Sequence, residues 1–216
     1  MESTLSDQTL DLLKLEKQQV NEYFDTPINI LVVVGPAQAS WRLPAELLCD
    51  KLPGFAPAVR RSVQENNALS LYISKGDPSV FAAVVDWLLS GQLQCHKPHE
   101  SVDSSEEHHC LHRYRVHTFA ERYHSEKLCN AATRRARLCI RLSTSLPNSA
   151  EIQNMFSQSP SNQCFQNLIV SEVVNTFFIL SMDDVRNGMS ELIETISSHP
   201  GFHSLFLIAV KARYQA

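Results

Sequence analysis

The chain has 216 residues, of which 44% are hydrophobic and 19% are charged, and its formal net charge is −4. This composition excludes a chain that is disordered throughout, and the negative charge excludes a strong overall attraction to nucleic acid. The sequence has no long apolar run, no signal peptide and no CxxC pair, so we expect no membrane span and a location inside the cell, in cytoplasm or nucleus.

The first predicted element is an amphipathic helix over residues 1–24, in which leucine and valine are mixed with lysine and glutamate. The β-branched run 28–34 follows, and it predicts a strand that is buried on both faces. Residues 41–43 predict a short returning strand, so that the two strands form a hairpin. A helix over 44–49 comes next and has proline in its first turn, where proline is tolerated.

A second short helix over 55–63 leads to a predicted strand over 68–73, where apolar and polar side chains alternate. Asp77 is then a predicted N-cap, and the helix that it opens ends at Gly91. The apolar residues of this helix repeat at helical spacing, so we expect one buried face that contains Phe81, Val84, Val85, Leu88 and Leu89.

The second half of the chain is predicted to be helical. After a polar loop over 95–109, helices are expected over 111–123 and 128–142. The polar stretch 143–162 is the predicted linker. Three further helices make up a predicted extension over 163–216.

Five phrases accompany this order of elements: ILVVVG at 30–35, WRLPAELLC at 41–49, PGF at 53–55, FAAVVDWLLSG at 81–91, and VHTFAERY at 116–123 followed by Leu128 and Cys129. Together they resemble the BTB/POZ family, and most closely its single-domain members common in fungi. The resemblance covers residues 25–142 and implies an α+β fold, a small sheet surrounded by short helices. Pro44 departs from the family's usual histidine, and Leu88-Leu89-Ser90 departs from its usual tyrosine phrase.

The resemblance implies a non-enzymatic protein–protein interaction module that self-associates, with protein partners and no cofactor. In this family the N-terminal segment often pairs with a second protomer, so we expect residues 1–34 to contribute to a homodimer. Members that recruit the cullin scaffold of ubiquitin ligases often carry an apolar-x-Glu motif before the middle strand. Val63, Gln64 and Glu65 stand at the matching place and are the predicted partner-binding residues.

Two functions follow from this resemblance. One is a substrate adaptor for a cullin-based ubiquitin ligase. The other is a homo-oligomeric scaffold or transcription-related regulator with no ligase link, in which case the triplet at 63–65 is an ordinary acidic turn after a helix.

Two clusters of polar residues are further candidates for sites. Histidines and cysteines gather around the polar loop: Cys95, His96, His99, His108, His109, Cys110 and His112. They match no zinc signature, and histidines in a loop are usually solvated, so no metal is predicted. Arg134, Arg137 and Arg141 share one helix face. A solvated outer face is favoured for them over a site for phosphate or an acidic partner.

Motifs that carry catalysis are missing from the sequence. It contains no Gly-x-Ser-x-Gly elbow, no phosphate-binding glycine-rich loop and no His-Glu-x-x-His. We therefore expect no enzymatic activity.

Overall fold

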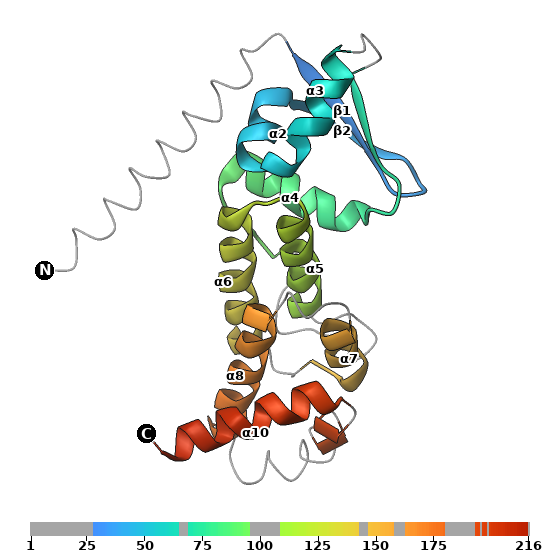
Figure 1. Ribbon diagram of the computed structural model, residues 1–216. Helices are drawn as coiled ribbons and strands as arrows, with labels where there is room; N and C mark the ends of the chain where they lie inside the picture. The colour runs from blue at the N-terminus through green and yellow to red at the C-terminus, as the bar shows by residue number, and fades with distance from the viewer. Residues whose placement is uncertain are drawn as a thin grey trace, which may run out of the picture. The chain divides into compact units, whose positions relative to one another are not determined.

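The structure is a computed structural model, and it describes residues 28–64, 69–95, 109–142, 147–157, 163–179, 193–194, 196–197 and 199–215. The described part is mostly helical and contains one small mixed sheet (Figure 1), which confirms the predicted α+β class. The helix predicted over 1–24 lies outside the described residues. Among the described helices, none combines the length and the apolar character that a membrane span requires.

The sheet has three strands in the order β2-β1-β3. Strand β1 (Asn29–Val34) pairs antiparallel with β2 (Ala39–Pro44) and parallel with β3 (Ser70–Ile73). The central strand is buried on both faces, because both Val32 and Val33 are shielded from solvent. The predicted buried strand and its hairpin are therefore confirmed.

Short helices follow the strands in the first part of the chain. Helix α2 (Ala45–Lys51) contacts β2, and helix α3 (Ala56–Gln64) contacts β3. A 3-10 turn over Pro53–Phe55 joins the two helices. The two short helices predicted over 44–49 and 55–63 are therefore present, and they end two residues and one residue later than predicted.

Helix α4 (Pro78–Ser90) has the boundaries that the sequence predicts. The Asp77 side chain accepts a hydrogen bond from the Ser79 amide at 2.8 Å, and Gly91 ends the helix in the left-handed conformation. The apolar face is buried as predicted except at Leu89, whose side chain is 39% exposed. The prediction was wrong there because the buried face also includes Val80, Ala83 and Trp87 and is centred near Val84. At 3.6 residues per turn, Leu89 lies about 140° around the helix from Val84.

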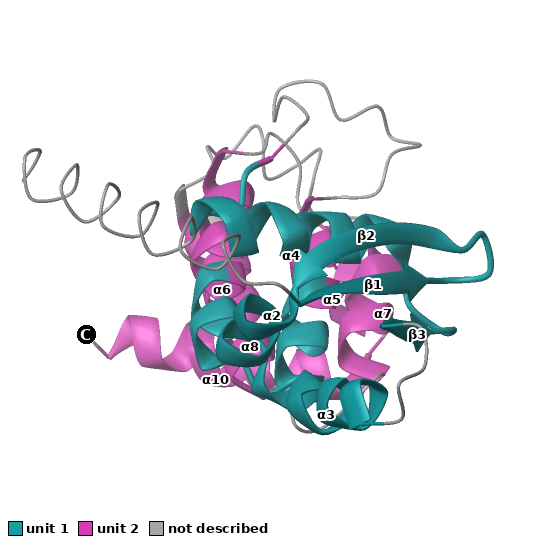
Figure 2. Cartoon of the chain, turned by 90° about the horizontal axis from the view of Figure 1, so that it is seen from above, with its two compact units in different colours: residues 1–94, 116–131 teal, residues 95–115, 132–216 magenta. Residues whose placement is uncertain are grey.

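The contacts within the chain define two compact units (Figure 2). The first unit contains residues 1–94 and 116–131, and the second contains 95–115 and 132–216. Helices α5 (His109–Arg122) and α6 (Glu126–Leu142) contribute residues to both. The predicted boundaries at 25–142 and 163–216 stay a prediction.

Aromatic rings pack closely in the first unit. The rings of Phe55 and Tyr123 are stacked with centroids 4.0 Å apart, and the Gly54 amide donates a hydrogen bond to the Tyr123 carbonyl at 2.9 Å. A Cβ atom at Gly54 would lie 2.6 Å from the Tyr123 Cα. Only glycine therefore fits this backbone approach without a shift.

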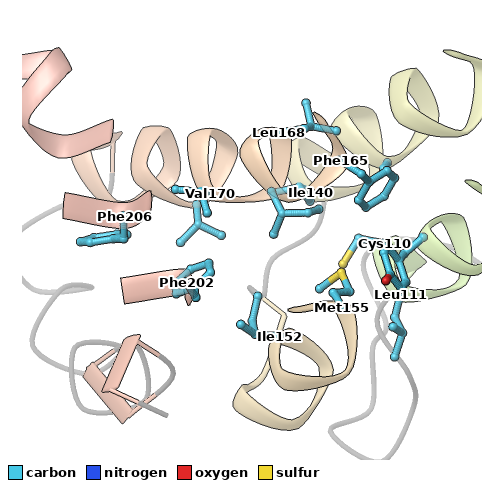
Figure 3. Close-up of a cluster of buried hydrophobic side chains, with 14 of the residues drawn as sticks. Cys110, Leu111, Ile140, Ile152, Met155, Phe165, Leu168, Val170, Phe202 and Phe206 are labelled. Atoms are coloured by element: carbon cyan, nitrogen blue, oxygen red, sulfur yellow. The ribbon is translucent and has the colours of Figure 1, made fainter. Parts of the chain in front are cut away.

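The second unit has its own apolar core, part of which Figure 3 shows. Helices α7 (Ser149–Ser157), α8 (Gln163–Ile179) and α10 (Pro200–Tyr214) contribute to it. Its buried residues include Cys110, Leu111, Tyr114, Ile140, Ile152, Met155, Phe165, Phe202 and Phe206. Helix α7 lies inside the segment 143–162 where the sequence predicts a linker, so part of that segment is a packed helix.

Candidate functional site

The predicted partner-binding triplet ends helix α3. Val63 and Gln64 are its last residues, and Glu65 lies outside the described residues. Both described residues line a groove of about 300 Å³ whose walls are almost entirely apolar. The full lining is Ile28, Ala45, Glu46, Cys49, Val59, Arg60, Val63 and Gln64.

Helical spacing on α3 explains how this groove is built. Val59 and Val63 are four residues apart, so they lie on the same side of the helix. Val59 is buried, whereas Val63 is 37% exposed and Ile28 is 38% exposed. Two large apolar side chains therefore remain accessible where the groove opens.

Polar groups of the groove are few and differ in charge. Glu46 and Arg60 are exposed and carry opposite charges. Cys49 is half-buried, and its burial raises the pKa of the thiol, while the nearby Arg60 charge acts in the opposite direction. The thiol is therefore neutral near neutral pH, and the groove is an apolar surface with one charge of each sign.

A second arrangement of reactive groups lies in the second unit, at Cys95 and Cys139. Their Sγ atoms are 3.3 Å apart, although the residues are 44 positions apart in sequence. Two guanidinium groups also donate to the Cys95 Sγ: Arg113 Nη2 lies 3.5 Å away and Arg135 Nε lies 3.3 Å away. The pair thus consists of one thiol with two cationic neighbours and one buried thiol.

These contacts separate the two thiols chemically. The hydrogen bond from Cys139, together with those from Arg113 and Arg135, outweighs burial and lowers the pKa of Cys95 to about 3. The same hydrogen bond, with burial, raises the pKa of Cys139. Of the two thiols, Cys95 is therefore the one whose surroundings favour the thiolate.

The histidines and cysteines around the predicted loop are only partly brought together. His109 joins Cys95 and Cys139, with all three donor atoms within 4.8 Å of one another. Cys110 instead lies in the apolar core, and His96, His99 and His108 lie outside the described residues. Three donors fall short of a structural tetrahedral site within the described residues, and two guanidinium groups on Cys95 oppose another cation. The 3.3 Å separation of the two sulfurs and the guanidinium contacts of Cys95 favour a dithiol.

The arginines predicted to form a solvated face are exposed, and two of them also bind a buried carboxylate. Arg141 donates two hydrogen bonds to Glu172 on α8, at 2.8 and 3.0 Å, and Arg137 lies 3.3 Å from the same carboxylate. The predicted exposed face is therefore present, and its pairing with Glu172 is a feature that the prediction lacked. Helical spacing placed them on one face correctly but carries no information about a partner 31 residues away.

Sequence reasoning missed Cys139, Glu172 and helix α7. Of these three features, only helix α7 has a recognisable signal in the sequence. Asn148 and Glu151 form a reciprocal capping box, in which each side chain accepts a hydrogen bond from the other's amide, at 3.0 and 2.9 Å.

Comparison with protein-family models finds no matching family, and comparison with curated proteins finds no match. The resemblance to the BTB/POZ family therefore remains a prediction that rests on the phrases and the element order. The α+β class and the groove stand on the structure alone.

Proposed function

We propose that this chain is a protein–protein interaction module whose partner surface is the apolar groove between α2 and α3. The observation that carries the proposal is the exposure of Val63 and Ile28 at the opening of that groove. Binding of an apolar side chain there would remove both from water, and each buried aliphatic side chain contributes about 1.5–3 kcal/mol.

The partner that we propose is the cullin scaffold of a ubiquitin ligase, with this chain as a BTB/POZ-like substrate adaptor. The support is a coincidence of two independent observations. The resemblance assigns partner binding to the triplet at 63–65, and the groove is lined by Val63 and Gln64. Glu46 and Arg60 would orient the partner, because opposite charges beside an apolar anchor favour one direction of binding.

The test is light scattering coupled to size-exclusion chromatography, on the chain alone and mixed with a cullin N-terminal domain. Val63→Glu places a charge at the groove opening, and we expect at least about tenfold weaker binding. Leu89→Glu is the matched control. Leu89 is also an apolar residue on a helix, it is 39% exposed compared with 37% for Val63, and it does not line the groove.

A complex that is lost with Val63→Glu and kept with Leu89→Glu supports the adaptor. A wild-type chain that ignores the cullin overturns it. If the chain alone is a dimer that only Val63→Glu dissociates, the groove holds a second copy of the chain. The protein is then the self-associating scaffold or regulator instead.

A further inference from the structure

The thiols of Cys95 and Cys139 lie close to the geometry of a covalent bond. Their Sγ atoms are 3.3 Å apart, and a disulfide requires a separation of about 2.05 Å. Both residues belong to the second unit. Bond formation would thus bring the two sulfurs closer by about 1.3 Å.

The two thiols also differ in accessibility, as a reacting pair must. Cys95 is partly exposed, whereas Cys139 is fully buried. Arg113 and Arg135 both donate to the Cys95 Sγ and stabilise a negative charge on it. Reactive cysteines have this environment: cationic neighbours, partial exposure and a second thiol within reach.

We propose that Cys95 and Cys139 form a peroxide-sensitive dithiol, in which Cys95 is oxidised first and Cys139 then closes a disulfide with it. No step of the proposal depends on the groove or on its partner. The site therefore adds a redox function to an interaction module.

Hydrogen peroxide is the oxidant, and the reaction proceeds in two steps. The Cys95 thiolate attacks one peroxide oxygen, the O–O bond breaks, and the released hydroxide takes up a proton to leave as water. This step oxidises Cys95 to a sulfenic acid by two electrons. The Cys139 sulfur then attacks the Cys95 sulfur, and the sulfenic hydroxyl leaves as water with the Cys139 proton, which leaves the disulfide.

The experiment is a peptide map of the whole chain after a short exposure to hydrogen peroxide, followed by alkylation of the remaining thiols. Trypsin releases residues 138–141, whose only cysteine is Cys139, and residues 76–113, which contain both Cys95 and Cys110 because Pro98 blocks cleavage after Lys97. Cys110→Ala therefore makes the assignment unique. A Cys164→Ser background removes the exposed thiol that could link two chains.

The expected result is a linked pair of these two fragments, lighter by two hydrogens than their sum, which persists with Cys110→Ala and is reversed by a dithiol reductant. Cys95→Ser should abolish the link and leave Cys139 free to be alkylated.

Two results would overturn the proposal. One is a Cys95 that stays reduced or proceeds to sulfinic acid without linking. The other is one equivalent of zinc in the purified protein, which protects both thiols from modification and is lost with Cys95→Ser. In that case His109 and the two cysteines would form a metal site.

Discussion

At the scale of single residues, the surroundings of a thiol decide whether it reacts. Cys95 has two guanidinium groups in contact with its sulfur. Cys129 has the opposite surroundings: burial first, and then the charges of Glu121 and Glu126, raise its pKa to about 11. The surroundings thus favour the thiolate at one position and the neutral thiol at the other.

This contrast predicts the order of alkylation by iodoacetamide at about pH 6, where only a thiol with a lowered pKa is deprotonated. We expect Cys95 to be labelled and Cys129 to remain unlabelled, because a lowered pKa keeps the thiolate present in acid and a raised pKa delays it to alkaline pH. Mass spectrometry of the digested protein measures both. A faster reaction at Cys129 than at Cys95 would contradict the assigned surroundings.

The contribution of one arginine can be separated in the same assay. Arg135→Gln removes the charge that contacts Cys95, so the alkylation of Cys95 should shift to higher pH. Arg134→Gln removes the same charge one residue earlier, at an exposed side chain for which the structure gives no contact with Cys95. Equal shifts in the two variants would mean that the contact is unimportant.

Gly54 provides a prediction about stability. Gly54→Ala would place a Cβ atom 2.6 Å from the backbone of Tyr123, so we expect the free energy of unfolding to fall by about 2 kcal/mol or more. Chemical denaturation measures the change. Gly201→Ala is the control, because its Cβ would meet only side-chain atoms, those of His199 at 3.2 Å and of Phe156 at 3.8 Å, and no backbone. Similar losses in both variants would show that the approach at Tyr123 is not the cause.

At the scale of elements, the sequence predicts those parts whose signals are local. The hairpin of β1 and β2 follows from a β-branched run stopped by glycine and proline, and α4 follows from Asp77 and Gly91, which lie next to the helix that they delimit. Helix α7 was missed because its polar residues outweigh Ile152 and Met155 in composition. Its capping residues were the better signal.

The candidate sites show the limit of such reasoning. Val63 and Gln64 were identified from the resemblance, but the opposite wall of their groove comes from α2 and the start of β1, and no periodicity indicates which elements face each other. No periodicity distinguishes Cys139 from the buried apolar residues beside it on α6. Its contact with Cys95 depends on the path of the chain over 44 positions.

The link between α6 and α8 predicts an asymmetry between its two sides. The Arg137 and Arg141 side chains are 50% and 57% exposed, whereas that of Glu172 is 5% exposed. Water can therefore solvate the arginines when the carboxylate is removed, but it cannot solvate the carboxylate when both arginines are removed. We expect Arg137→Gln with Arg141→Gln to lower the melting temperature by several degrees, and Glu172→Gln to lower it less. The reverse order in thermal unfolding would contradict a structural role for the pair.

At the scale of the whole molecule, the proposed disulfide would restrict the unfolded chain. It would join positions 44 residues apart, and the loss of chain entropy for a loop of this length corresponds to about 4 kcal/mol. The oxidised protein should therefore unfold at higher denaturant concentration than the reduced protein. Cys139→Ser, measured under the same oxidising conditions, should show no such gain. Equal midpoints for oxidised and reduced wild type would mean that the bond strains the folded state as much as it restricts the unfolded one.

Cys49 gives the groove a reporter of its own. Its half-buried thiol belongs to the lining, and burial keeps it protonated near neutral pH. It therefore reacts slowly, and its rate of modification depends on how much of the groove is open to solvent. Any occupant of the groove would cover this sulfur, so footprinting at Cys49 would measure the fraction of protein that is bound, in an unmodified sequence and without a dye or a tag.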